Sequence, residues 1–165
     1  MYDERFMKRA IEISRRALTE KGTEPFGAVV VRDGTVVGEG LNHSVAHWDP
    51  TSHGETEAIR DACRKLGTVD LNGSDLYSSC EPCALCVAAM HIVGIRKLYY
   101  ATSLDQSRAA FAGVSRAARH PIDVLELRAE SGKPIAGRKM PAEQKLDAEA
   151  IAVLLEWAST RKGSP

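Results

Sequence analysis

Two short motifs, one built on a histidine and one on cysteines, constrain this chain more than any other feature. The first is His53-Gly54-Glu55, and the second is Pro82-Cys83-Ala84-Leu85-Cys86. One imidazole and two thiolates form a mixed ligand set that suits zinc. Because three protein ligands leave a tetrahedral zinc one position for water, His53, Cys83 and Cys86 predict a catalytic site that holds one Zn2+ per chain.

Both motifs are predicted to lie where helices begin. Pro82 is favoured in the first turn of a helix, and the two cysteines are three residues apart, so both thiols project from one face of that turn. A helix N-terminus also stabilises the thiolate form. The alternative is a buried histidine with two ordinary core cysteines, or a redox pair of cysteines. Glu55 is the predicted proton carrier, although a first-turn glutamate can also simply interact with the helix dipole.

The rest of the chain predicts an α/β fold. Two β-rich runs, residues 26–31 and 35–42, flank Asp33-Gly34, which is a strong hairpin signal. Helices are expected at residues 3–20, 52–66, 82–93, 106–112 and 142–159, and further strands at 76–79, 97–102 and 122–127. This alternation predicts a three-layer α/β/α sandwich. The helix at 82–93 carries almost no charge, so we expect it to be largely buried.

Composition excludes several classes of protein. The chain has 165 residues and a formal net charge of zero, with 22 acidic and 22 basic residues. Nucleic-acid-binding proteins more often show a basic excess, so nucleic acid is not an expected partner. No apolar run approaches the roughly 18 residues of a membrane-spanning helix, and the charged start of the chain is unlike a signal peptide. We therefore expect one cytoplasmic domain, residues 1–165, without membrane association.

Aromatic and amide side chains outside the two motifs are candidates for binding a planar substrate. Asn42 ends the second strand of the hairpin, where its amide can donate and accept hydrogen bonds at the edge of a heterocycle, or can instead stabilise a turn. Phe26 and Trp48 can stack on a ring, or can equally be packing residues.

The motifs resemble the signature of the zinc-dependent cytidine-deaminase superfamily, His-x-Glu followed by Pro-Cys-x-x-Cys. More narrowly, Pro25-Phe26-Gly27-Ala28-Val29, Asp49-Pro50-Thr51 and Ser79-Cys80-Glu81-Pro82-Cys83 look like bacterial guanine deaminases and their relatives. The resemblance implies a mixed five-stranded sheet and a homodimer in which the C-terminal helix, residues 142–160, packs at or across the interface. It also implies zinc bound by His53, Cys83 and Cys86, proton transfer by Glu55, and contacts to the base from Phe26 and Asn42. Together with Gly54 and Trp48, these two residues form the predicted substrate-binding set.

Two departures from the resemblance concern residues 111–115 and residues 157–165, which lack the terminal aromatic residue that covers the site in guanine deaminases. Guanine deaminases carry an acid just after the last matching region, where it meets the purine's second amino group, whereas residues 111–115 here contain none. Gly54 stands where alanine is common, at a cost of about 1 kcal/mol in helix propensity. The predicted function is a zinc-dependent hydrolytic deaminase that releases ammonia from a free amino-substituted nucleobase, guanine-type first.

Three alternatives stay open at this point. The substrate can be cytosine, isocytosine or a triazine-type heterocycle. The chain can be a tRNA adenosine deaminase, which shares the motif. It can also be a zinc-stabilised binding module without catalysis, which needs a fourth protein ligand such as Cys80.

Overall fold

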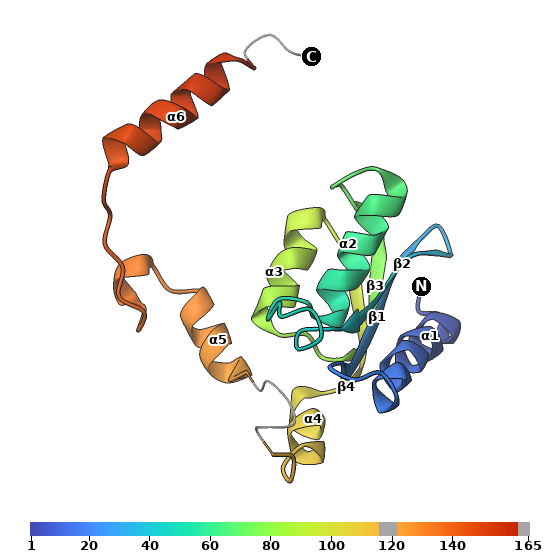
Figure 1. Ribbon diagram of the computed structural model, residues 1–165. Helices are drawn as coiled ribbons and strands as arrows, with labels where there is room; N and C mark the ends of the chain where they lie inside the picture. Colours follow the sequence, from blue (N-terminus) through green and yellow to red (C-terminus); the bar gives the residue numbers. More distant parts are fainter. Residues whose placement is uncertain (116–121, 162–165) are drawn as a thin grey trace. The chain divides into compact units, whose positions relative to one another are not determined.

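The computed structural model describes residues 1–115 and 122–161. The chain divides into two compact units, Met1–Arg128 and Ala129–Pro165, which are described separately. The first unit contains a mixed sheet and the predicted motifs (Figure 1). The prediction of a single domain over residues 1–165 stays a prediction.

The sheet of the first unit has four strands in the order β2-β1-β3-β4. They are β1 (Glu24–Arg32), β2 (Thr35–Asn42), β3 (Asp75–Cys80) and β4 (Lys97–Thr102). Strand β1 pairs antiparallel with both β2 and β3, and β3 pairs parallel with β4. The predicted hairpin is present, because Asp33 and Gly34 both take the positive φ angles that a tight turn between β1 and β2 requires.

Helices cover both faces of this sheet, as the pattern predicted (Figure 1). Helix α1 (Glu4–Arg15) packs its buried stripe against one face, where the core includes Ile13, Val29 and Tyr77. Helices α2 (Gly54–Leu66) and α3 (Ala84–Val93) lie on the other face, over a core that includes Val30 and Leu76. The sheet is therefore the middle layer of three.

Two glycines of β2 let α2 approach the sheet closely. A Cβ atom at Gly38 would lie 2.3 Å from the carbonyl oxygen of Ala58, and one at Gly40 would lie 2.1 Å from the carbonyl oxygen of Gly54. Because neither glycine has a side chain, the backbone of α2 packs directly on β2 and the start of the helix is held against the sheet. This contact positions the His-x-Glu motif.

The prediction of five strands was wrong for the described residues, in which the sheet has four. The segment predicted as the last strand, residues 122–127, instead enters helix α5 (Val124–Ser131). Asp123 precedes this helix, and its side chain accepts a hydrogen bond from the backbone N–H of Glu126 at 2.9 Å. Apolar residues over so short a run fit both the two-residue period of a strand and the 3.6-residue period of a helix. The aspartate that caps the helix start favours the helix.

The remaining helices are short or lie in the second unit. Helix α4 (Leu104–Ala110) follows β4, and a 3-10 turn (Arg16–Leu18) follows α1. The second unit contains the end of α5, a 3-10 turn (Ile135–Gly137) and α6 (Asp147–Ser159). Helix α6 begins at Asp147, whereas the sequence predicted a start at residue 142. Across the described residues, none of these helices combines the length and apolar character needed to cross a bilayer.

Helix α3 is less buried than its uncharged sequence predicts. Only Cys86 and Met90 are buried, whereas Val87, His91 and Ile92 are exposed, Ile92 at 84%. Apolar residues therefore lie on two faces of the helix. One face packs on the core beside α2, and the other presents apolar side chains on the surface of the first unit.

Candidate metal centre and active site

The three predicted ligands come together at the starts of two helices. His53 is the N-cap residue of α2 and Cys83 is the N-cap residue of α3, with Cys86 one turn further on. The Sγ atoms of Cys83 and Cys86 are 3.7 Å apart, and His53 Nδ1 lies 3.5 Å from the first sulfur and 3.4 Å from the second. Among the described residues, these three form the group of donors close enough to share a metal ion.

This triangle has the dimensions of a zinc site. In a tetrahedral site with Zn–S bonds of ~2.3 Å and Zn–N bonds of ~2.0–2.1 Å, two sulfurs lie about 3.8 Å apart, and a sulfur and a nitrogen about 3.5 Å apart. The distances between the three ligand atoms match both values to within about 0.2 Å. Cys80 is buried near by but lies outside the group, so the described residues supply three ligands.

The two thiols of the site differ in their protonation. The hydrogen bond between the two thiols is the main cause that lowers the pKa of Cys83 to about 4. The same hydrogen bond, together with burial, raises the pKa of Cys86. Without metal, Cys83 is therefore the thiolate and Cys86 keeps the proton, which a bound cation would displace.

Glu55 lies beside the ligands, in the first turn of α2. It is buried, its Oε1 accepts a hydrogen bond from Ser78 Oγ at 3.1 Å, and its Oε2 lies 3.4 Å from Cys86 Sγ. Burial raises the pKa of this carboxyl above its usual value. A carboxylate that is buried, oriented by a hydroxyl group and adjacent to a metal site is suited to take up and release a proton.

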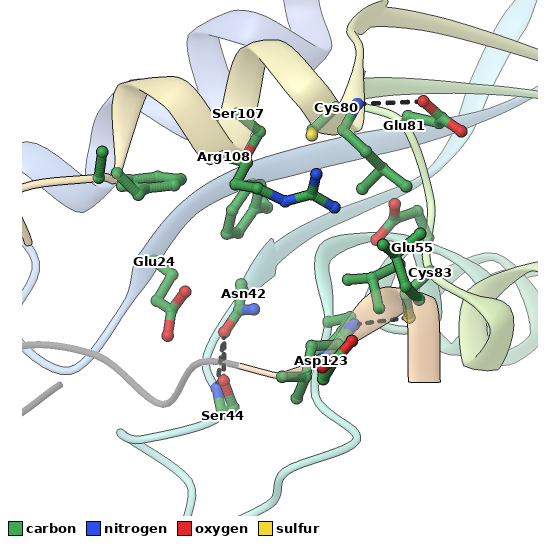
Figure 2. Close-up of a pocket in the computed structure, with 18 residues that line it drawn as sticks. Glu24, Asn42, Ser44, Glu55, Cys80, Glu81, Cys83, Ser107, Arg108 and Asp123 are labelled. Atoms are coloured by element: carbon green, nitrogen blue, oxygen red, sulfur yellow. Dashed lines mark hydrogen bonds between the residues drawn. The ribbon is translucent and has the colours of Figure 1, made fainter. Parts of the chain in front are cut away.

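A cavity of about 580 Å³ opens over this centre (Figure 2). Its wall includes His53, Cys83 and Glu55 at one end. Pockets of roughly 300–1,000 Å³ are typical of small-molecule sites. The cavity is therefore of a size that admits a small ligand to the metal centre.

Two of the predicted substrate-binding residues line the cavity. Phe26 forms an edge-to-face pair with Phe111 at a ring-centroid distance of 5.8 Å, and both rings are part of the wall. Asn42 is buried at the end of β2, and its Oδ1 accepts hydrogen bonds from the backbone N–H and the hydroxyl of Ser44, at 3.0 and 2.5 Å. This arrangement leaves the Nδ2 of Asn42 as the donor that can meet a ligand.

The other two predicted substrate-binding residues are not among those that line the cavity. Trp48 lies in the loop after β2 with a positive φ angle, and 90% of its side chain is exposed. Gly54 is buried at the start of α2, where its Cα faces the backbone of Phe26. Substrate contact by Trp48 or Gly54 stays a prediction that the cavity does not support.

The sequence interpretation missed several residues of the wall, among them Glu24, Arg108, Phe111 and Asp123. Figure 2 shows the guanidinium group of Arg108 pointing toward the middle of the cavity. Phe111 and Asp123 come from segments in which the sequence shows no recognisable motif. Glu24 directly precedes the Pro25-Phe26 motif, and this adjacency was the one signal that pointed to the site.

Comparisons with known proteins agree with this geometry. The family described as "Cytidine and deoxycytidylate deaminase zinc-binding region" matches residues 1–102. Guanine deaminase of Bacillus subtilis (strain 168) is 34% identical over 157 residues, which cover 95% of this chain and 94% of that protein. The tRNA-specific adenosine deaminase of Agrobacterium fabrum (strain C58 / ATCC 33970) is 36% identical over 146 residues, covering 86% of this chain and 95% of that protein.

The fold shows the same relationship. The X-ray structure of guanine deaminase from Bacillus subtilis matches with a TM-score of 0.80 at 34% sequence identity, covering 96% of this chain and 95% of that one. The predicted superfamily is thereby confirmed. The chain belongs to the zinc-binding family of cytidine and deoxycytidylate deaminases, hydrolytic enzymes that act on carbon–nitrogen bonds.

Proposed function

We propose that this protein deaminates a free amino-substituted nucleobase, guanine-type first, and that His53, Cys83 and Cys86 hold one zinc ion per chain. The observation that carries the proposal is the position of Glu55. Its carboxylate is buried, lies 3.4 Å from the sulfur of Cys86 and faces a cavity of about 580 Å³. A structural zinc site has no use for such a carboxylate or for an open cavity.

Proton transfer by Glu55 follows from this arrangement. When bound, zinc would supply the activation of a water molecule near neutral pH. Glu55 takes one proton from the attacking water molecule at its carboxylate and delivers it to a ring nitrogen of the substrate. It then takes the remaining proton of that water from the hydroxyl group now on the ring carbon and passes it to the amine, which leaves as ammonia. Ser78 holds Oε1 of Glu55 at 3.1 Å, which leaves Oε2 directed at the ligand set for the transfer.

The cavity wall supports a planar, polar-edged substrate. Phe26 and Phe111 provide an apolar surface for the face of a ring. The amide Nδ2 of Asn42 provides a donor for a carbonyl oxygen or an unprotonated ring nitrogen. These contacts favour a base with a carbonyl or imine edge, of which guanine is the first candidate.

A tRNA adenosine deaminase is the second candidate, because one of the similar proteins has that activity by name. The charges on the described part of the cavity wall oppose it. Four acidic side chains, Glu24, Glu55, Glu81 and Asp123, line the wall, whereas Arg108 is the one Lys or Arg residue there. A site that binds a polyanion such as tRNA would carry an excess of basic side chains.

A homodimer is part of the same proposal. The outward side of α3 presents Val87 and Ile92, and the neighbouring edge strand β4 presents Tyr100, 48% exposed. Exposed apolar side chains that gather on adjacent elements are typical of an interface. Sedimentation analysis tests this point, and Ile92→Lys should shift a dimer toward monomers.

An ammonia-release screen tests the proposed reaction. Zinc-loaded protein is incubated with guanine, other purine bases, cytosine, isocytosine, aminotriazines, nucleosides and tRNA. We expect release from guanine-type bases, and a decrease on the order of 10²- to 10⁴-fold in Glu55→Gln with zinc content unchanged. Glu57→Gln, in the same helical turn but away from the cavity wall, is the matched control. Comparable turnover by Glu55→Gln would refute the mechanism, and release from tRNA alone would favour the second candidate.

A further inference from the structure

A buried carboxylate that the proposed mechanism does not use lies in the wall of the cavity. Glu24 opens β1, and only 6% of its surface is exposed. Glu24 also lies outside the group of metal ligands. Its position therefore fits a role in contacting the ligand that fills the cavity.

The pairing of the strands places Glu24 next to Asn42. The two residues are direct partners in the antiparallel register of β1 and β2, so their side chains leave the same face of the sheet. Figure 2 shows both side chains at one side of the cavity. A register shift follows between Glu24 and Gly27, and such bulges re-aim side chains next to active sites.

The two side chains present complementary hydrogen-bonding groups. The Oδ1 of Asn42 is engaged by Ser44, which leaves Nδ2 as a donor, whereas Glu24 offers acceptors only. A carboxylate has about four acceptor positions, so a contact with the ligand does not require that Glu24 lack other partners. A donor beside an acceptor matches a heterocycle edge on which a carbonyl or imine nitrogen lies near an N–H group.

We infer that Glu24 is a specificity-determining residue whose carboxylate accepts a hydrogen bond from a ring N–H of the free base. The inference rests on the proposed function, and it deepens that function by naming what distinguishes one base from another. A base that carries a methyl group or a sugar on that nitrogen has no proton to donate and brings bulk against a buried charge. Such a substrate is disfavoured twice.

Asp123, the other unassigned carboxylate of the wall, does not fit this role equally well. Its side chain accepts the backbone N–H of Glu126 at 2.9 Å and so serves the start of α5. Asp123 is also exposed, whereas Glu24 is buried. A hydrogen bond to a buried charge discriminates more strongly than one made in contact with water.

The test compares wild type, Glu24→Gln and Glu24→Leu on guanine and on its 1-, 7- and 9-methyl derivatives. For guanine we expect Glu24→Gln to lower kcat/KM roughly 10- to 100-fold, mainly through KM, and Glu24→Leu to lower it further. For the derivative that lacks the recognised N–H, the ratio of wild type to variant should fall toward one. The identity of that derivative shows which ring supplies the proton. Analogues that are not turned over are compared as competitive inhibitors.

Controls separate this role from a structural one. Glu4→Gln, on the exposed surface of α1, should leave every ratio unchanged, and zinc content and thermal unfolding establish that the variants fold. Equal losses on guanine and on all three methyl derivatives, or no loss at all, would overturn the inference while leaving the proposed function intact. Absence of ammonia release from guanine by the wild type would overturn both.

Discussion

Gly54 of α2 packs closely on the backbone of Phe26 in β1, and its replacement by alanine tests that contact. A Cβ atom at this position would lie 2.4 Å from the carbonyl oxygen of Phe26 and 3.0 Å from its carbonyl carbon. Since Cβ contacts below 3.0 Å essentially do not occur, α2 and β1 must separate by about 0.6 Å or more. Both neighbours are backbone atoms, so no side chain can rotate away.

The energetic balance of Gly54→Ala has two opposing parts. Alanine improves helix propensity by at most about 1 kcal/mol, and less at the first helical residue. Overpacking of a buried backbone contact typically costs about 1–3 kcal/mol. We therefore expect a net loss of about 1 kcal/mol in the free energy of unfolding, opposite in sign to the prediction from helix propensity.

The catalytic effect of Gly54→Ala should exceed its effect on stability. Gly54 lies between His53 and Glu55, and Phe26 lies on the cavity wall, so the substitution moves a metal ligand, the proton carrier and the wall together. A displacement approaching 1 Å costs up to about 100-fold in rate, and we expect a decrease of 10- to 100-fold in kcat/KM.

The assay combines ammonia release, zinc content and chemical unfolding. Gly137→Ala, where an added Cβ would meet nothing within 4 Å, serves as the control. Wild-type kcat/KM together with increased stability in Gly54→Ala would refute the reasoning, because it would mean that α2 and β1 do not make this contact.

Three further predictions concern the carboxylate, the thiols and an ion pair. Ser78→Ala removes the hydroxyl that orients Glu55, and should lower kcat roughly 10- to 100-fold with zinc content unchanged; an unaltered kcat would show that Ser78 is only a core residue. Zinc binding to the metal-free chain near pH 7 should release about one proton or more as Cys86 ionises, so apparent affinity rises with pH; calorimetry in buffers of different ionisation enthalpy measures this, and a pH-independent affinity would contradict it. The hydrogen bond from Arg9 lowers the pKa of Glu39, so this pair should contribute about 1 kcal/mol of stability that is present above the ordinary glutamate pKa and is lost as the pH falls through the lower folded value. Unfolding of Glu39→Gln at pH 7 and at pH 3 checks it, and an equal deficit at both would be evidence against the pair.

The metal centre was predictable from sequence because its spacing is local. Cys83 and Cys86 are one helical turn apart, and His53 begins a helix whose start β2 holds in place. Ligand identity and helix geometry therefore determine most of the site. The helix start at Pro82 and the hairpin at Asp33 follow from equally local rules.

The cavity wall was less predictable because it depends on which way individual side chains turn. Glu24 reaches the cavity through a strand that bulges just after it, and no periodicity in the sequence indicates that shift. Trp48 has the composition of a stacking residue but lies exposed in a loop. The segment at residues 122–127 fits a strand and a helix equally well in its apolar pattern, and only the cap at Asp123 distinguishes them.

The division of the cavity between separate stretches of chain has a consequence for how the protein can be altered. The groups proposed to hold metal and move protons come from the first turns of α2 and α3, whereas another part of the wall comes from α4 and the start of α5. Because the two sets share no element, exchanging residues 104–125 for those of a relative should shift substrate preference, with Glu24, Phe26 and Asn42 unchanged, and leave the hydrolytic machinery in place. Laboratory selection for new substrates can therefore draw its libraries from that segment together with Glu24, Phe26 and Asn42, and leave the first turns of α2 and α3 unchanged.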